Sequence, residues 1–422
     1  MSARACALIL VLLAGATAAA AGERPVLLRV GINGEYPPFA LIAKPPEPRV
    51  IDLTDPRVLT PARPAAPVGF DVDVAQRFAA DTGRTLELIP FAWPEMTDRL
   101  EEEKLDLVMS GVTLRPERAF SGRFSRPYLV TGAVVVVRAE EADRVQRIDW
   151  LDAPNVRIAV NRGGYLEGLA ERRFPTAQLT ATSDNTRLPQ MVLEGEVDAV
   201  VAERFEAQTW EKLGLHASQP FTHDLKIYMA SPAQDGLVRI LDDWLVQREN
   251  DGWMSKLRRK WFGDRAVISP ADLCVEAVRA RVQTRLDLMP VVAAAKLRSG
   301  QLIEDAGQEA RVLNHARKLA KHHGLPPDSV ALAFRQLIEA AKVVQLQVLQ
   351  SPDSRPTRNV SLEAARRAVA AESDELIAEL ARCRRHLGRL ASSGPILVAG
   401  VSPDLSSRIL GALAAAATTT EP

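Results

Sequence analysis

A glycine turn in the middle of the chain places a carboxylate where it could do acid–base chemistry. Val160-Asn161-Arg162-Gly163-Gly164-Tyr165-Leu166-Glu167 is expected to leave a strand and open a helix. The free backbone N–H groups at such a helix start can bind a carboxylate. A carboxyl group buried in a closed cleft beside an anionic substrate would have a raised pKa and could donate a proton near neutral pH. Spacing alone favours the interpretation of Glu167 as a first-turn glutamate that interacts with the helix dipole.

Two basic residues in the C-terminal third of the chain are spaced at a helical interval. Arg285 and Lys296 lie eleven residues apart, which is about three turns of an α-helix, so both would project from one face. Pro290 falls between them and predicts a kink in that helix. Downstream, Ile303-Glu304-Asp305 and a segment at 338–345 follow in order.

The elements that would position these residues differ between the two halves of the chain. From Val26 to Asp264, short apolar strands alternate with amphipathic helices, which predicts a mostly parallel sheet in two α/β lobes. After Ile268 the apolar residues recur at helical spacing, which predicts an all-helical domain. The expected boundaries are lobe one at about 26–130 and 220–264, lobe two at about 131–219, the helical domain at 270–392, and a C-terminal tail at 393–422 that frays from Ala414.

The composition excludes several classes of protein. The chain has 422 residues, with 53 basic and 53 acidic side chains, so a nucleic acid is not expected as its main partner. Residues 1–21 have the charged, apolar and small-residue order of a secretory signal peptide, and no later apolar run is long enough to span a membrane. Seven prolines between Lys44 and Pro67 predict a long surface insertion, which could be a lid or simply a disordered loop.

Cysteine usage agrees with export. Removal of the signal would leave Cys274 and Cys383, which could form one disulfide in an oxidising compartment. Two buried free thiols are the alternative. The clustered histidines, including His315, lack the cysteine or carboxylate partners of a zinc site, so no metal site is predicted.

The motifs of the first half resemble a known family. Asn33 to Phe39, Gly69 to Ala75, Ser110 to Arg118 and Phe124 to Tyr128 occur in order, and together they resemble the periplasmic family 3 solute-binding proteins over residues 26–264. The resemblance implies that Arg118 binds a substrate carboxylate. It implies further substrate contacts at Tyr36, Thr113, Glu203 and Lys226.

The glycine turn refines this resemblance. A Gly-Gly turn with a glutamate three residues on is similar to cyclohexadienyl dehydratase, which implies that Glu167 is the acid that protonates the leaving hydroxyl of prephenate. Tyr165 departs from the small hydroxyl residue usual in that turn. Glu203 offers a carboxylate suited to an amino group, so either arogenate is also a substrate or the lobes merely bind an amino acid.

The helical half resembles the secreted all-helical chorismate mutases over roughly 272–390. The resemblance implies that Arg285 and Arg366 bind carboxylates, that Lys296 and Gln345 contact the ether oxygen, and that Glu309 with Asp305 serves the hydroxyl side. Two positions depart from the family: Gln308 replaces an arginine, and Ala341 replaces a hydroxyl residue. Arg311, three residues beyond Gln308 on nearly the same face, is the candidate substitute.

The sequence therefore predicts a secreted, periplasmic bifunctional enzyme. It would convert chorismate to prephenate and prephenate to phenylpyruvate, and arogenate to phenylalanine as a further reaction. Neither chemistry requires a cofactor. The alternative is an amino-acid-binding domain fused to an active mutase, and the oligomeric state is left open, with a homo-oligomer possible.

Overall fold

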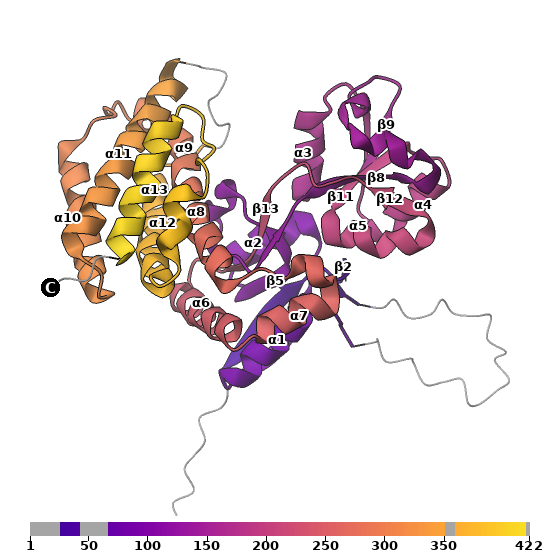
Figure 1. Cartoon of the computed structure of the whole chain (residues 1–422), viewed down its shortest axis with the longest axis horizontal. Helices are drawn as coiled ribbons and strands as arrows, with labels where there is room; N and C mark the ends of the chain where they lie inside the picture. The colour runs from indigo at the N-terminus through magenta and orange to yellow at the C-terminus, as the bar shows by residue number, and fades with distance from the viewer. Residues whose placement is uncertain (1–25, 43–65, 351–358, 419–422) are drawn as a thin grey trace, which may run out of the picture.

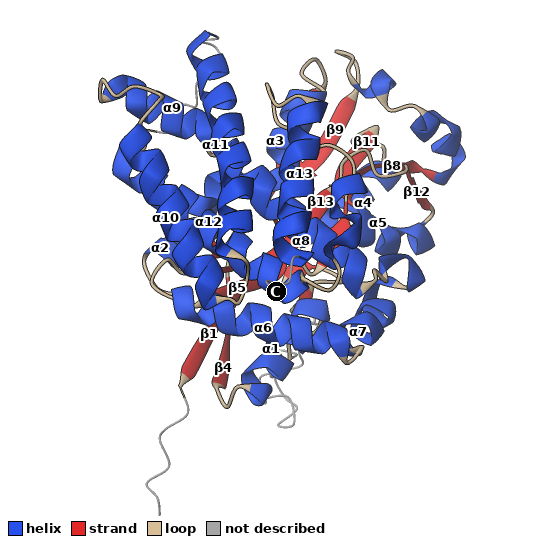
Figure 2. Cartoon of the chain, turned by 60° about the vertical axis from the view of Figure 1, so that its left-hand side comes forward, coloured by secondary structure: helices blue, strands red, loops and turns tan. Residues whose placement is uncertain are grey.

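The computed structural model describes residues 26–42, 66–350 and 359–418. The signal segment and nearly all of the proline-rich insertion lie outside these described residues. A two-lobed α/β unit is followed by a unit of helices, which confirms the predicted fold class (Figure 1). Figure 2 shows that the strands are confined to the two lobes.

Lobe one is built on a mixed sheet of order β4-β1-β5-β13-β6, with β7 pairing to β13. Strands β4 and β5 both run parallel to β1, and β13 returns antiparallel to β5 after the chain has crossed to lobe two and back. The strands are β1 (Leu27–Ile32), β2 (Glu35–Tyr36), β3 (Ala40–Leu41), β4 (Thr85–Pro90), β5 (Leu107–Thr113), β6 (Arg123–Phe124), β7 (Leu129–Thr131) and β13 (Asp224–Ala230), and the helices are α1 (Phe70–Asp81), α2 (Met96–Glu101), α6 (Asp235–Asn250) and α7 (Trp253–Phe262).

Lobe two has a second sheet of order β10-β9-β11-β8-β12. The adjacent strands β10, β9 and β11 are parallel, whereas β8 runs antiparallel to β11 and to β12. The elements are β8 (Ala133–Arg138), β9 (Arg157–Asn161), α3 (Tyr165–Arg173), β10 (Gln178–Thr182), α4 (Leu188–Leu193), β11 (Ala199–Glu203), α5 (Arg204–Trp210) and β12 (Leu215–Ala217).

The helical domain contains α8 (Pro270–Asp287), α9 (Met289–Arg298), α10 (Ala306–His322), α11 (Pro327–Gln350), α12 (Leu362–Cys383) and α13 (Pro403–Thr418). The interruption expected at Pro290 is confirmed: α8 ends at Asp287, the single residue Leu288 follows in αR conformation, and Pro290 lies in the first turn of α9, where its missing N–H costs no hydrogen bond. The expectation of a tail that frays from Ala414 is wrong through Thr418, because α13 continues to Thr418, packs on α11 and buries Ala416 and Ala417.

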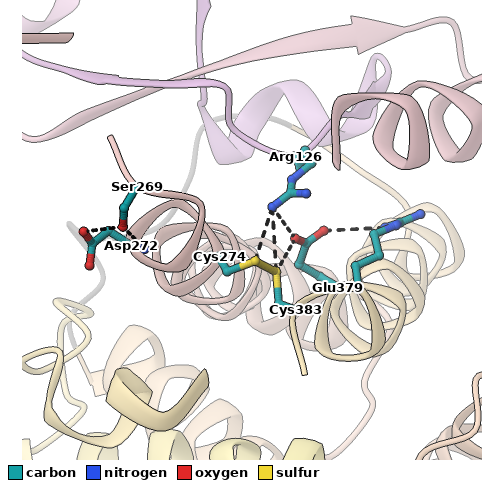
Figure 3. Close-up of a disulfide and its surroundings, with 7 residues drawn as sticks. Arg126, Ser269, Asp272, Cys274, Glu379 and Cys383 are labelled. Carbon is teal, nitrogen blue, oxygen red and sulfur yellow. Dashed lines mark hydrogen bonds and ion pairs between the residues drawn. A yellow bond between two sulfur atoms is a disulfide. The ribbon is translucent and has the colours of Figure 1, made fainter. Parts of the chain in front are cut away.

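A disulfide between Cys274 and Cys383 joins α8 to α12, which is the first of the two possibilities that the cysteine count left open (Figure 3). It lies at the contact between the helical domain and lobe one. Arg126 of lobe one places Nη2 at 3.1 Å from a carboxylate oxygen of Glu379 and at 3.6 and 3.7 Å from the two sulfur atoms. Apolar residues of both units, such as Val112 and Leu286, form one continuous core. The helical domain is therefore packed against lobe one and is not merely tethered to it.

Among the described residues, none of the helices has the length and apolar character needed to cross a membrane.

Candidate active sites

A cavity of about 380 Å³ opens between the helices of the C-terminal domain. Apolar side chains such as Val292, Phe334 and Ile338 form part of its wall. It also collects every residue that the sequence predicted for this domain: Arg285, Lys296, Asp305, Glu309, Arg311, Gln345 and Arg366.

The basic side chains of the cavity form hydrogen bonds within the protein but keep further N–H groups available for a ligand. The Arg285 side chain donates to Ser373 Oγ at 3.1 Å, and burial lowers the pKa of its guanidinium to about 10. Lys296 Nζ donates one hydrogen bond, at 2.6 Å to the carbonyl oxygen of Ile303. Burial lowers the pKa of Lys296, and the nearby charge of Arg366 lowers it further. The ammonium thus retains two protons for a ligand.

Asp305 connects the start of α10 to the opposite wall. As the N-cap, its side chain accepts from Gln308 N at 2.9 Å. Its other oxygen accepts from Arg366 Nη2 at 3.0 Å. The backbone hydrogen bond and the basic neighbours lower the pKa of Asp305, so it is ionised at neutral pH. Arg366 is thereby aimed along the cavity wall.

Gln308, which stands where the resemblance expects an arginine, holds Arg311. Its Oε1 accepts from Nε at 3.2 Å and from Nη2 at 2.8 Å of the Arg311 guanidinium. Both side chains line the cavity. The structure therefore brings the candidate substitute to the expected place.

Gln345 carries an unused acceptor. Its Nε2 donates to the Ala341 carbonyl oxygen at 3.1 Å, while Oε1 is buried and has no hydrogen-bond partner among the described residues. Which end of the amide faces the cavity is an assignment that a ligand could reverse. One polar end of Gln345 is free for a ligand in either orientation.

Two cavity residues were missed by the sequence reasoning. Lys342 lines the cavity with its Nζ 2.8 Å from Glu339 and 3.7 Å from Glu309. His315, for which the sequence predicted no metal site, also lines it and places Nε2 at 2.7 Å from Asp374. The helical interval from Ile338 through Lys342 to Gln345 could have signalled the lysine.

A second site lies between the two lobes. The side chains of Tyr36, Thr113, Arg118, Glu203 and Lys226, all predicted from the sequence, line this cleft. Strand β5 continues to Thr113, so Thr113 and Arg118 stand at the carboxyl end of the lobe-one sheet. The free space is about 20 Å³, room for one or two water molecules, so the lobes are closed on each other.

Lys226 is committed to the protein itself. Its Nζ donates to Gly111 O at 2.8 Å, to Thr113 Oγ1 at 3.0 Å and to Tyr36 Oη at 3.3 Å. All three ammonium protons are used, and burial lowers the pKa of Lys226. Arg118 has one such bond, from Nη1 to Thr113 O at 2.9 Å, and its burial lowers the pKa of the guanidinium to about 10. Arg118 is thus the cation with more hydrogen-bonding capacity left for a carboxylate.

Two carboxylates complete the cleft. Glu203 is buried at the start of α5, where Oε2 accepts from the N–H groups of Phe205 and Glu206 at 2.8 and 3.0 Å and Oε1 accepts from Thr131. Burial raises the pKa of Glu203. Asp224, which the sequence reasoning missed, accepts from Tyr165 Oη at 3.1 Å.

Glu167 lies in the predicted first turn of α3 but does not line the cleft. Its Oε2 accepts from Gly163 N at 2.6 Å, so the carboxylate closes back on the glycine turn. A Cβ at Gly164 would lie 2.3 Å from Asn161 Nδ2, so a larger residue there would displace the Asn161 side chain, and the positive φ of 70° at Gly163 favours glycine at that position. The structure places the other predicted cleft residues together and leaves Glu167 at their edge.

Comparisons with known proteins divide the chain in the same way. The family of bacterial extracellular solute-binding proteins, family 3, matches residues 55–264, and chorismate mutase type II matches residues 278–346. The cyclohexadienyl dehydratase of Pseudomonas aeruginosa is 29% identical over 241 residues, 56% of this chain and 82% of that protein. The L-cystine-binding protein TcyJ of Escherichia coli (strain K12) is 25% identical over 246 residues, 57% of this chain and 84% of that protein. The crystal structure of an ancestral amino acid-binding protein, a precursor of cyclohexadienyl dehydratase, is 30% identical with a TM-score of 0.49, covering 56% of this chain and 95% of that one.

Proposed function

The chain belongs to the family 3 extracellular solute-binding proteins through residues 55–264 and to the type II chorismate mutases through residues 278–346, and on this premise we propose a secreted bifunctional enzyme of phenylalanine biosynthesis. The helical domain converts chorismate to prephenate, and the two-lobed domain converts prephenate to phenylpyruvate. The observation that carries the proposal is the convergence of seven predicted residues on one cavity. The likeness of the first domain to a cyclohexadienyl dehydratase supports the second activity. Its extracellular family and the N-terminal sequence support a periplasmic location.

The mutase reaction needs positioning and charge. The rearrangement of chorismate is pericyclic, so the protein must hold a dianion in its reactive conformer and stabilise charge on the breaking ether oxygen. Arg285 and Arg366 bind the two carboxylates, and the free protons of Lys296 with the amide of Gln345 contact the ether oxygen. Glu309 with Asp305 faces the hydroxyl side.

Arg311 supplies the positive charge that Gln308 lacks. The two hydrogen bonds from its guanidinium to Gln308 Oε1 fix its direction. A glutamine that orients an arginine can thus replace an arginine at the same turn of the helix. Lys342 adds further positive charge on the facing helix α11.

The dehydratase reaction needs an acid and an anion site. Arg118 binds a carboxylate of prephenate with Tyr36 and Thr113 beside it, and the hydroxyl leaves as water when it receives a proton while carbon dioxide leaves from the ring. We assign the proton to Glu167. The closed cleft has only about 20 Å³ of free space, so the lobes must open to admit prephenate, and Glu167 must exchange its hydrogen bond to Gly163 for one to the bound substrate. Lys226 holds Tyr36 and Thr113 in place through its own hydrogen bonds.

A second candidate function rests on the acids of the cleft. Glu203 and Asp224 face the same space as Arg118 and Lys226. Because the ammonium protons of Lys226 are already used within the protein, Arg118 with two carboxylates suits a ligand that carries both a carboxylate and an amino group. Arogenate is such a compound and would give phenylalanine directly. If Glu167 is not an acid, the same set describes an amino-acid-binding domain fused to a mutase.

The deciding experiment supplies the mature chain with chorismate and, separately, with prephenate at neutral pH, and follows chorismate loss and phenylpyruvate formation. Phenylpyruvate from both substrates is expected. Glu167→Gln should abolish phenylpyruvate formation while chorismate is still consumed and prephenate accumulates. Glu171→Gln, one turn further along α3, is the matched control and should leave both rates unchanged. Unchanged phenylpyruvate formation by Glu167→Gln would refute the assignment of Glu167 as the acid. If the wild type does not turn over prephenate, the two-lobed domain is a binding domain and not a dehydratase.

A further inference from the structure

A groove at the back of the hinge takes no part in either proposed reaction. It has a volume of about 410 Å³. On one side lie α5 and β12 of lobe two with the segment 218–220 that follows β12, and on the other side lies the short helix Asp264–Ala266 that follows α7. Its polar lining includes Arg204, Gln208, Glu211, His216, Ser218 and Arg265. We call this the hinge groove.

The hinge groove brings together two arginines from the two sides of the hinge. Arg204 opens α5 in lobe two. Arg265 lies beside Ala266, which is buried in the core of lobe one. Within the described parts of the chain, neither guanidinium forms an ion pair with a carboxylate, although both line the same groove. The acidic Glu211 also lines the groove, but among the described residues it forms no ion pair with either arginine. The two guanidinium groups therefore repel each other, and an anion between them would offset that repulsion.

The electrostatic surroundings agree with this placement. Burial lowers the pKa of Arg204, and the charge of Arg265 lowers it further. The acid that acts on Arg204 in the opposite direction is its neighbour Glu203, whose oxygens are already bound to Thr131 and to two backbone N–H groups. Glu203 is therefore not a partner for the groove.

The groove lies over the contact between the lobes. Phe205, which follows Arg204, packs on Phe262 of α7 with ring centroids 4.9 Å apart, and the Arg204 guanidinium lies 5.1 Å from the Phe205 ring centroid. Glu203, which precedes Arg204, lines the cleft. At the junction of β11 and α5, Glu203 thus lines the cleft and the next residue, Arg204, lines the hinge groove.

We propose that the hinge groove binds a compact dianion, held by Arg204 on one side and Arg265 on the other. Each guanidinium can offer two parallel N–H groups to an oxyanion, which suits inorganic phosphate or a short dicarboxylate. The side-chain amide of Gln208 supplies a neutral donor on the same wall. A bound dianion ties α5 to the segment after α7 and so fixes the angle between the lobes from behind the cleft.

The test is isothermal titration of the mature chain with inorganic phosphate, and in a second arm with succinate, at constant ionic strength. Saturable binding is expected, and Arg204→Gln or Arg265→Gln should each weaken it about tenfold or more, because each removes one charge-assisted contact. Arg265→Lys should also weaken binding, since it keeps the charge but loses the fork. Arg335→Gln, an exposed arginine on α11, is the matched control and should bind as the wild type does.

The outcomes separate cleanly. Saturation by phosphate alone, by succinate alone, or by both in competition supports the site and identifies the anion. Binding that is unaffected by Arg265→Gln would place the anion in the helical cavity or the cleft and overturn the proposal, as would an equal loss in Arg335→Gln or no saturable binding of either anion. Arg265 is exposed, so its variants should fold, and thermal unfolding with the mutase rate checks this. None of these outcomes bears on the two proposed activities.

Discussion

The helical cavity and the two-lobed cleft use similar residues in different states. The cavity keeps about 380 Å³ open among basic groups that retain free hydrogen-bonding capacity. The cleft has about 20 Å³ of free space, and the charged groups of Lys226 and Glu203 form their hydrogen bonds within the protein. Helices fix the spacing of the cavity residues, whereas the cleft is assembled when two lobes meet. The first site is preorganised and the second depends on hinge movement.

The largest expected effect would test whether the two sites act separately. Lys296→Ala removes a charged donor from the place of the ether oxygen, so the mutase rate should fall by about 10²- to 10³-fold. Prephenate turnover should not change, because Lys296 lies in the cavity alone. Chorismate disappearance and phenylpyruvate formation from added prephenate are the two measurements.

Lys342→Ala is the matched control for that variant. Its ammonium also lines the cavity but is paired with Glu339 at 2.8 Å, so its loss should cost much less. A parallel loss of prephenate turnover in Lys296→Ala would contradict the separation of the sites.

The cleft offers the next largest effect. Arg118→Lys keeps one charge but loses the planar fork, so the KM for prephenate should rise by about 10- to 100-fold, with chorismate loss unchanged. Steady-state kinetics on added prephenate measure this. Arg115→Lys is a sharper comparison, because Arg115 lies over the Tyr165 ring at 4.5 Å and is outside the cleft lining. Equal KM values for the two variants would mean that Arg118 does not bind the substrate.

The sequence predicted the cavity better than the cleft for a physical reason. A helix repeats every 3.6 residues, so the interval from Arg285 to Lys296 predicts one shared face even across the break at Pro290. The position of Glu167 within its helix was also predictable. The direction of its carboxylate was not, because the free N–H of Gly163 competes for it and that competition is decided by local geometry.

Contacts between the units could not be read from the sequence at all. The cysteine count allowed the disulfide, but nothing in the pattern indicated that Arg126, far away in lobe one, would contact it (Figure 3). The alanine-rich end of the chain looked like a frayed tail, yet α11 offers it an apolar surface on which Leu413 is buried. Such packing depends on partners that are remote in sequence.

A smaller effect would show how the cavity replaces a missing arginine. Gln308→Leu keeps the side-chain size but removes the acceptor for the Arg311 guanidinium, so kcat/KM for chorismate should fall by about tenfold. Gln308→Glu restores an acceptor and should recover part of the rate. A full rate in Gln308→Leu would show that Arg311 is oriented without it, and dehydratase turnover is the internal control.

The smallest effect at neutral pH concerns the charge of Lys296. Burial and the nearby Arg366 lower its pKa below the ordinary value of 10.5, and the reaction needs the ammonium form. The charge is lost as pH rises through the folded pKa, so the alkaline limb of the mutase rate should fall below pH 10.5 while the rate at pH 7 is unaffected. Lys296→Arg should move that limb upward, since a guanidinium stays protonated, although the rate at neutral pH falls with the altered geometry. If the alkaline limb stays in place in Lys296→Arg, the titration belongs to another group. The charge on which the mutase rate depends would then not be that of Lys296.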